Sequence, residues 1–243
     1  VMNFEPVTFA TAGELSQAVA RAFVDEIEAA NRDGKRYCVA ISGGRICHKF
    51  FPSIVEQLQS RAVSIQHVHF FWADERCVPS DDPESNHRLA DELLFQPLKV
   101  AEAQIHRIRG EDLPEIAAQK AEAEIRQIAS RSLKNQPVLD LILLGMGEDG
   151  HVASLFPDES EALVASPAVY RAVKNSPKPP PNRVTLGYPA IAAAQKVWVL
   201  VSGAGKERSL TDSLNASGQT SLARVLKSRS TAKIFTDVKV LRF

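Results

Sequence analysis

Short apolar segments alternate with longer amphipathic segments along most of the chain, and this alternation restricts the possible folds more than any other feature. The apolar segments are rich in β-branched and aromatic residues and mostly lack the polar alternation of a half-exposed strand, which is typical of buried parallel strands. They are residues 37–41, 68–72, 139–144, 197–201 and 233–236. Residues 14–30 and 114–133 repeat apolar side chains at helical spacing, the second with proline in its first turn. The pattern predicts an α/β fold with a doubly wound, mostly parallel sheet and helices on both faces.

The composition is that of an ordinary globular protein. The chain has 243 residues, of which 44% are hydrophobic and 24% charged, and this excludes disordered, collagen-like and coiled-coil chains. At about 150 residues per domain, the length allows one or two domains. The proline-rich segment 176–182 is followed by too little strand pattern for a second domain. We therefore interpret it as a surface loop beside the site and expect one domain over residues 1–243.

The charge balance and the cysteines limit which binding partners and which cellular compartment we expect. Lysine plus arginine and aspartate plus glutamate number 29 each, so no basic excess indicates a nucleic-acid partner. Cys38, Cys47 and Cys77 form no CxxC motif and no even set, which disfavours a disulfide-stapled secreted protein. The first residues do not form a signal peptide, and no segment approaches the ~20 apolar residues that span a membrane. We expect a cytoplasmic protein with no membrane partner, monomeric or weakly homo-oligomeric.

Polar, glycine-rich segments follow several predicted strands, where ligands gather in doubly wound folds. Ser42-Gly43-Gly44-Arg45 follows the first strand and leads into a helical pattern. Two glycines there let the backbone approach a ligand, and a helix N-terminus attracts an anion. A glycine pair fits a simple tight turn equally well, so this segment alone is weak evidence for a phosphate site.

Charged residues follow the second predicted strand directly. Asp74-Glu75-Arg76 stands at its end, and Arg76 can hold a phosphate through two hydrogen bonds. Further on, Ser85 and Asn86 are each best interpreted as an N-cap of the next helix.

A turn with three glycines in six residues follows the third predicted strand and ends in His151. A histidine whose tautomer is held by a neighbouring carboxylate such as Asp149 can act as a general base near neutral pH. The other histidines lack this setting, and we expect structural roles for them: His48, His67, His69, His87 and His106.

The fourth predicted strand is followed by Ser202-Gly203-Ala204-Gly205-Lys206. Glu207 stands where a P-loop needs serine or threonine, which disfavours a nucleoside triphosphate site. Lys206 can still serve a monophosphate as a point charge. Arg183, after the proline-rich segment, is a further candidate cation.

Taken together, these segments resemble the 6-phosphogluconolactonase family, within the larger group that includes glucosamine-6-phosphate deaminases. The matching segments are SGG at 42–44, DER-VP-DD--SN across 74–86, GMGEDGHVASLFP at 145–157, RVTL at 183–186 and SGAGK at 202–206. Asp149-Gly150-His151 and Arg76 follow the lactonase pattern, where deaminases typically carry Asn-Gly-His and tyrosine. The resemblance covers most of the chain.

The resemblance implies hydrolysis of 6-phospho-D-glucono-1,5-lactone to 6-phosphogluconate, in the oxidative pentose phosphate pathway. His151 would activate water, with Asp149 orienting it. The 6-phosphate would lie against Arg76, Lys206 and the Gly43-Gly44 backbone. The residues implied for the site are Gly43, Gly44, Arg45, Asp74, Arg76, Asp149, His151, Arg183 and Lys206. No metal-ligand spacing appears, and the reaction requires no cofactor.

The sequence departs from the family's usual pattern in its first loop, and two other functions are possible. Arg45-Ile46-Cys47 replaces the hydroxyl residues usual in the family's first loop, so Arg45 either supplies a charged phosphate contact or points to solvent. A glucosamine-6-phosphate deaminase or isomerase would use Asp74 for proton transfer at carbon and His151 for ring opening. A non-catalytic sugar-phosphate sensor would usually carry a DNA-binding domain, for which too few residues precede the first predicted strand.

Overall fold

A six-stranded parallel sheet forms the centre of the computed structural model, which describes residues 4, 6–129 and 132–240. Its strand order is β1-β11-β10-β7-β2-β3, and every pair is parallel. The strands are β1 (Val7–Thr8), β2 (Tyr37–Ile41), β3 (Val68–Trp72), β7 (Leu141–Gly145), β10 (Lys196–Val201) and β11 (Lys233–Thr236). The predicted mostly parallel sheet is therefore confirmed.

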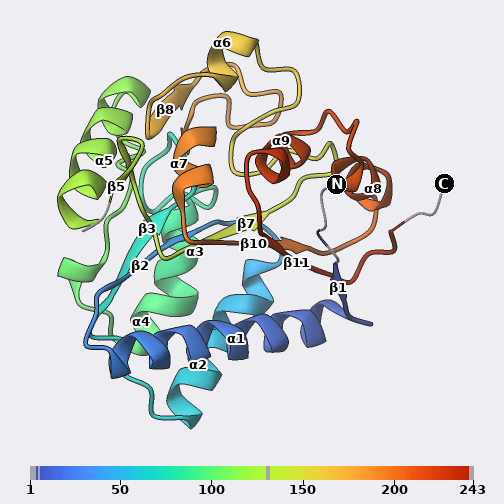
Figure 1. Ribbon diagram of the computed structural model, residues 1–243. Helices are drawn as coiled ribbons and strands as arrows, with labels where there is room; N and C mark the ends of the chain where they lie inside the picture. Colours follow the sequence, from blue (N-terminus) through green and yellow to red (C-terminus); the bar gives the residue numbers. More distant parts are fainter. Residues whose placement is uncertain (1–3, 5, 130–131, 241–243) are drawn as a thin grey trace.

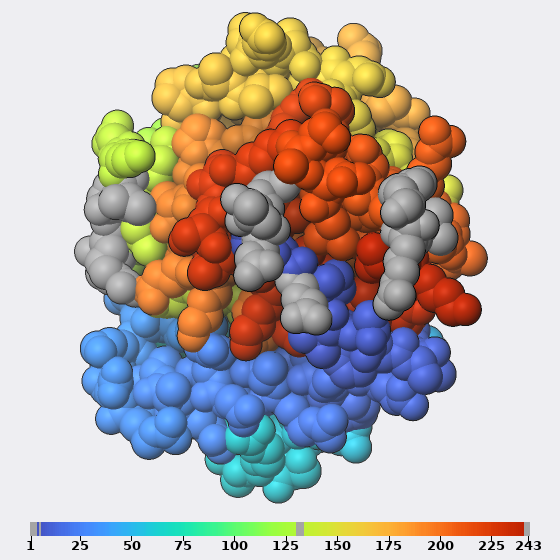
Figure 2. Space-filling view, turned by 45° about the vertical axis from the view of Figure 1, so that its right-hand side comes forward, coloured from blue at the N-terminus to red at the C-terminus, as the bar shows by residue number. Residues whose placement is uncertain are grey.

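Helices cover both faces of this sheet, as predicted (Figure 1). The helices are α1 (Ala12–Arg32), α2 (Cys47–Ser60), α3 (Asn86–Ala90), α4 (Gln96–Leu98), α5 (Pro114–Ile128), α6 (Glu161–Val164), α7 (Tyr188–Ala193), α8 (Glu207–Leu214) and α9 (Ser221–Lys227). A π-helical turn, η1 (Asp91–Phe95), joins α3 to α4, and a short 3₁₀ turn, η2 (Glu102–Gln104), follows. Helices α1 and α2 pack together on one face, and α7 and α9 lie on the other. Figure 2 shows α1 running beneath the orange and red C-terminal segments.

The apolar strands are buried because helices lie over both of their faces. All five residues of β2 are buried, and so are five of the six in β10. The two tryptophans, Trp72 and Trp198, are at most 1% exposed. Burying a large apolar side chain stabilises the fold by roughly 1.5–3 kcal/mol, which fixes the strands that carry the polar turns.

Several predicted boundaries need correction. The helix predicted over 114–133 ends at Ile128, and Ser132–Leu133 instead pairs with Gln136–Pro137 as strands β5 and β6. Lys134 and Asn135 both have positive φ, which closes a tight hairpin where the apolar spacing alone suggested more helix. The third strand begins at Leu141 rather than residue 139, and the fourth at residue 196 rather than 197.

A second, antiparallel sheet was not predicted. It consists of β4 (Asp74–Arg76), β9 (Arg183–Leu186) and β8 (Tyr170–Val173), in that order. These strands have only three or four residues each, so their side-chain pattern is too short to stand out. The sheet matters for the site because it pairs Arg76 directly with Arg183.

The topology brings the glycine-rich turns to one edge. From β2 the chain moves outward to β3 and later returns to β7 on the other side of β2. Ligands of doubly wound sheets bind at the carboxyl ends of the strands beside such a reversal. The turns after β2, β7 and β10 all lie at this edge.

Residues 1–3 and 5, part of the stretch expected not to be a signal peptide, are outside the described residues, as are 130–131 of the predicted helix. Within the described ranges, no helix is both long enough and apolar enough to cross a membrane. Cys47 is a buried free thiol and Cys77 a half-buried one.

Candidate active site

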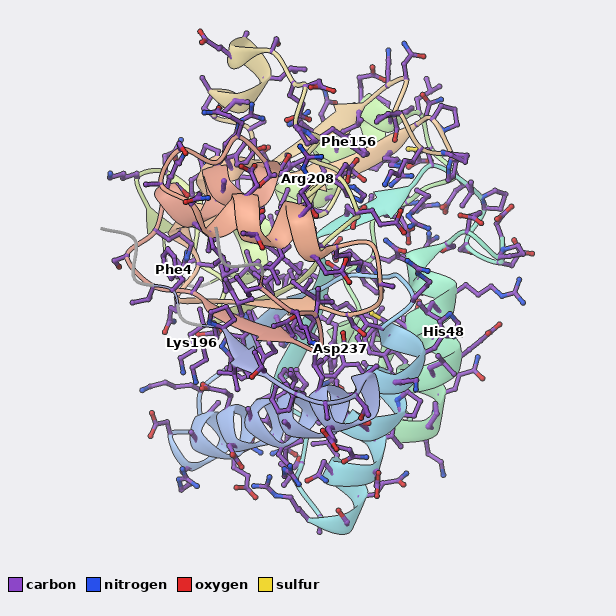
Figure 3. The ribbon with its side chains drawn as sticks, turned by 90° about the vertical axis from the view of Figure 1, so that its right-hand side faces the viewer. Phe4, His48, Phe156, Lys196, Arg208 and Asp237 are labelled. Atoms are coloured by element: carbon purple, nitrogen blue, oxygen red, sulfur yellow. The ribbon has the colours of Figure 1, made fainter. Side chains whose placement is uncertain are left out.

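An open cleft of about 280 Å³ lies at the carboxyl edge of the sheet. Eight of the residues expected in the site line this cleft: Gly43, Gly44, Arg45, Asp74, Arg76, His151, Arg183 and Lys206. Asp149, the ninth, lies behind His151 and bonds to it. In Figure 3, the label Phe156 marks the segment after β7, and Asp237 marks the segment after β11. His48 marks helix α2.

His151 and Asp149 form a hydrogen-bonded pair. The imidazole Nδ1 lies 2.5 Å from Asp149 Oδ1, which also accepts the His151 backbone N–H at 3.2 Å. Partial burial alone would raise the pKa of Asp149, but the hydrogen bond and charge of His151, with Lys178 behind them, hold that pKa well below its ordinary value. An ionised Asp149 fixes the proton on Nδ1, so Nε2 carries the lone pair that a general base needs.

Glycine is required where this pair forms. A Cβ on Gly147 would lie 2.1 Å from both Nδ1 and Cε1 of His151, so any larger residue would displace the imidazole. Gly150 has a φ of +80°, and a Cβ there would lie 2.6 Å from the Thr220 side chain. The turn after β7 is therefore shaped by its glycines to hold the His151 ring.

The turn after β2 offers its backbone to the cleft. Gly44 has a φ of +101°, which an L side chain rarely adopts. A Cβ on Gly43 would lie 1.9 Å from Asn86 Oδ1, so Gly43 lets the two segments pack together. In the described part of the chain, the amides of Gly43, Gly44 and Arg45 donate to no other group. Free amides on a turn before a helix suit an anion.

Asp74 belongs to a buried polar chain at the back of the cleft. Its Oδ2 accepts a 2.6 Å hydrogen bond from Ser154 Oγ, and the side chain of Asn86 donates to its carbonyl oxygen at 2.9 Å. Arg183 Nη1 in turn donates to Ser154 Oγ at 3.3 Å. These bonds fix the carboxylate of Asp74 relative to two cleft segments.

Arg183 lies in the cleft wall, but loop carbonyls occupy most of its guanidinium. Nη2 donates to the carbonyl oxygens of Lys178 and Pro179 at 3.0 and 2.9 Å, and Nε donates to that of Pro180 at 3.0 Å. The ring of Phe156 lies 5.8 Å below the charge. Arg183 therefore clamps the proline-rich loop, and its expected phosphate contact stays a prediction.

Arg76 and Lys206, two further candidate cations, differ in their partners. Arg76 Nη1 donates to the Glu84 carbonyl at 2.7 Å, while its buried Nε has no hydrogen-bond partner among the residues described. Lys206 is half-buried and makes no ion pair within the described ranges. Burial lowers the pKa of Lys206, and repulsion from Arg45 lowers it further. A half-buried ammonium without a carboxylate partner favours the binding of an anion.

Sequence reasoning missed several residues of the site. Lys178, from the proline-rich loop, lines the cleft and places Nζ 3.6 Å from Asp149 Oδ2. Glu148 and Asn86 also line it. A lone lysine in a proline run carries no local signal, and only the clamp by Arg183 brings it here.

Glu75 stands between the cleft residues Asp74 and Arg76 but does not itself line the cleft. It is buried, and its carboxylate accepts the backbone N–H groups of Arg76, Asn86 and His87 at 2.7–2.8 Å. Burial nevertheless raises the pKa of Glu75 to about 7. The carboxylate anchors the start of α3 to β4, where the expected N-cap by Ser85 is confirmed through its 3.2 Å bond from the Arg88 amide. Asn86 is instead the first helical residue.

The five other histidines lie outside the cleft lining. His106 is buried and bridges His69 Nδ1 at 2.8 Å and Glu124 Oε1 at 2.7 Å. Burial lowers the pKa of His69 to about 4, and the neighbouring His106 adds to this effect. Among the described residues, no group of three or more His, Cys, Asp or Glu side chains is placed to hold a metal ion.

The cleft is strongly cationic although the chain is neutral overall. Its lining includes the cations Arg45, Arg76, Lys178, Arg183 and Lys206 and the carboxylates Asp74 and Glu148. A small anionic substrate fits this balance, because the local surplus is positive and the remaining surface compensates for it.

Comparison with known proteins points to one family. The family described as glucosamine-6-phosphate isomerases/6-phosphogluconolactonase matches residues 10–234. A probable chloroplastic 6-phosphogluconolactonase of Oryza sativa subsp. japonica is 34% identical over 211 residues, covering 83% of this chain and 64% of the relative. The chain thus spans about two thirds of the length of that relative.

Solved structures share the fold over nearly the whole chain. The 6-phosphogluconolactonase of Trypanosoma brucei has a TM-score of 0.81 and 28% identity, with 97% of each chain covered. A monomeric glucosamine-6-phosphate deaminase has a TM-score of 0.80 at 21% identity, covering 96% of this chain and 97% of its own. The second likeness, at that identity, concerns the fold alone.

Proposed function

Because the chain belongs to the glucosamine-6-phosphate isomerase/6-phosphogluconolactonase family, we propose that it hydrolyses 6-phospho-D-glucono-1,5-lactone to 6-phosphogluconate. The observation that carries the proposal is the His151–Asp149 pair, which faces a cationic cleft through the imidazole. The proposed unit is one lactonase domain over residues 1–243. The substrate is a small sugar-phosphate lactone.

The first step is attack of water on the lactone carbonyl. His151 Nε2 takes a proton from the water as its oxygen bonds to C1, while the Asp149 carboxylate stabilises the imidazolium that forms. Negative charge develops on the carbonyl oxygen, and the surrounding cations stabilise it because the cleft walls partly exclude solvent.

The second step opens the ring. The tetrahedral intermediate collapses, the bond between C1 and the ring oxygen breaks, and the imidazolium returns its proton to that oxygen. The products are a carboxylic acid, which ionises, and a free hydroxyl. The proton taken from water and returned to the ring oxygen is carried by His151.

The 6-phosphate is proposed to bind at the turns after β2 and β10. Lys206, which forms no ion pair with any residue described, supplies a charge there, and the amides of Gly43 and Gly44 supply donors. Charge-assisted hydrogen bonds of this kind contribute about 1.5–3 kcal/mol each. Phosphate binding at this end would place the lactone ring toward His151.

The decisive assay measures lactone hydrolysis with correction for spontaneous ring opening. We expect enzymatic turnover that His151→Ala lowers by about 10²- to 10⁴-fold, with His48→Ala as the matched control because that exposed histidine lies outside the cleft lining. Intact hydrolysis in His151→Ala would rule out the proposed base.

Deamination of glucosamine 6-phosphate is the second candidate, because the Asp74 carboxylate faces the same cleft as His151. Ammonia release from that amino sugar tests it. Robust release without lactone hydrolysis would replace the first proposal. If the protein binds a sugar phosphate but neither hydrolyses the lactone nor releases ammonia, its function is that of a non-catalytic sugar-phosphate sensor.

A further inference from the structure

An exposed ion pair at the edge of the cleft joins two turns that are far apart in the sequence. Arg45 follows β2 and Glu148 follows β7, and Arg45 Nη2 lies 3.2 Å from Glu148 Oε1. The two side chains are 80% and 58% exposed, although both line the cleft. Water surrounds such a pair, so its net stabilisation is small and another anion can separate it.

Glu148 lies beside the other cation at this end of the cleft. A Cβ on Gly205, the residue before Lys206, would lie 3.7 Å from Glu148 Cγ, so the carboxylate side chain lies against that turn. Lys206 is electrostatically attracted by Glu148 and repelled by Arg45. Glu148 therefore places a carboxylate next to the two cations that face the proposed phosphate position.

Arg45 has space to move. A second hollow of about 360 Å³ adjoins the cleft, and both are lined by Gly44, Arg45, Arg76 and Asn86. The Arg45 guanidinium borders both hollows, so no packed wall holds it against Glu148.

We propose that Glu148 is an internal competitor for Arg45, and that a phosphate dianion displaces it and takes over the arginine. The inference rests on the proposed binding of a sugar phosphate in this cleft. A dianion interacts more strongly with Arg45 than the single charge of Glu148, whereas a monoanion such as nitrate has no such advantage. The pair thus makes the site selective for doubly charged anions.

The test is a double-mutant cycle on binding, with 6-phosphogluconate and glucosamine 6-phosphate as probes in calorimetric titrations. We expect Glu148→Gln to tighten binding about two- to fivefold, the range that an exposed ion pair supports. In the Arg45→Ser background the same change should give a smaller gain, because only direct repulsion is then removed. Equal gains in both backgrounds would overturn the proposal, since Glu148 would then only repel the ligand.

Nitrate gives a second readout and Asp33 a matched control. Nitrate should compete more strongly with the sugar phosphate in Glu148→Gln than in the wild type, and equal competition would contradict the selectivity. The Lys35–Asp33 pair has similar exposure, 71% and 59%, and precedes β2 at the opposite edge of the sheet. Asp33→Asn should therefore leave every dissociation constant unchanged.

Binding and turnover separate the two proposals. If the Glu148/Arg45 double-mutant cycle shows coupling but the protein does not hydrolyse the lactone, the competitor role of Glu148 stands and the lactonase proposal fails. If the protein hydrolyses the lactone but the effects of the two substitutions on binding are additive, the lactonase proposal stands and the competitor role of Glu148 fails.

Discussion

The back wall of the cleft and its rim use charge in opposite ways. At the back, Asp74, Ser154 and Arg183 are buried, and each is held by hydrogen bonds to fixed partners. At the rim, Arg45 and Glu148 form an ion pair and are mostly exposed. Buried polar groups are strongly penalised when a partner is lost, whereas an exposed pair exchanges partners easily. The back wall therefore suits positioning, and the rim suits capture of a mobile anion.

The largest effect is expected at the His151–Asp149 pair, whose hydrogen bonds hold the imidazole in place much as the back wall holds its own polar groups. His151→Ala removes the proposed base and should lower kcat/KM about 10²- to 10⁴-fold with little change in KM. Steady-state lactone hydrolysis, corrected for spontaneous opening, measures it. A change in KM alone would mean that His151 binds the substrate and does not act as the general base.

Lys206 should give the next largest effect. Lys206→Ala removes a charge-assisted contact and should raise KM about tenfold or more. Its pKa is lowered, mainly by burial, so the ammonium loses its proton at lower pH than an ordinary lysine. Binding of 6-phosphogluconate should therefore weaken as pH rises through that lowered pKa.

The matched variant for this pH effect is Lys206→Arg, which keeps the charge. Titrations of 6-phosphogluconate over the alkaline range should show a flatter profile for the arginine variant. Identical alkaline profiles would mean that another group causes the weakening.

Replacing Arg183, which clamps the proline-rich loop, should have an intermediate effect on stability and activity. Arg183→Lys keeps the charge but cannot reach three carbonyls and Ser154 together, so we expect a loss of about 1–2 kcal/mol of folding stability. Thermal unfolding should shift by several degrees, and kcat should fall because Lys178 is displaced from Asp149. Unchanged melting with raised KM would instead assign Arg183 to phosphate binding.

The smallest effect is expected at the rim. Arg45→Ser should raise KM a few-fold and leave kcat nearly unchanged, because the contact proposed for this exposed arginine is with the phosphate and not with the reacting carbonyl. The increase should shrink at high salt, where charges in water are screened. An unchanged KM at low salt would mean that Arg45 is not a phosphate ligand.

The pH dependence of catalysis offers a check on the His151–Asp149 pair. Although partial burial raises the pKa of Asp149, the hydrogen bond and charge of His151 hold that pKa well below its ordinary value, so Asp149 should stay ionised over the range where an ordinary aspartate titrates and add no acid limb to the profile of kcat/KM. A second acid limb in the wild-type profile would show that Asp149 titrates in the same range.

Much of the site was predictable because its residues follow buried strands directly. The apolar segments identified β2, β3, β7, β10 and β11, and parallel strands end at a common edge. Gly43, Arg76, His151 and Lys206 could therefore be grouped before their distances were known. The end of α5 could not be predicted, because the apolar spacing continues past Ile128 into a hairpin turn.

The residues that escaped prediction depend on contacts across the fold. Lys178 reaches the cleft because Arg183 binds the loop carbonyls, and Asn86 reaches it because Gly43 leaves room for its amide. Neither contact has a local pattern. The short β4-β9-β8 sheet that aligns Arg76 with Arg183 is likewise fixed by pairing between distant segments.

The sequence by itself determined the doubly wound class, the edge where the polar turns gather and the nature of the general base candidate, because periodicity and glycine placement are local properties. Only the tertiary structure decided how the cations divide. Arg183 is occupied by carbonyls, Lys206 is without a carboxylate partner in the described chain, and Arg45 is paired with Glu148. Partner choice among charges depends on distance and burial, and these are set only when the strands and turns pack together.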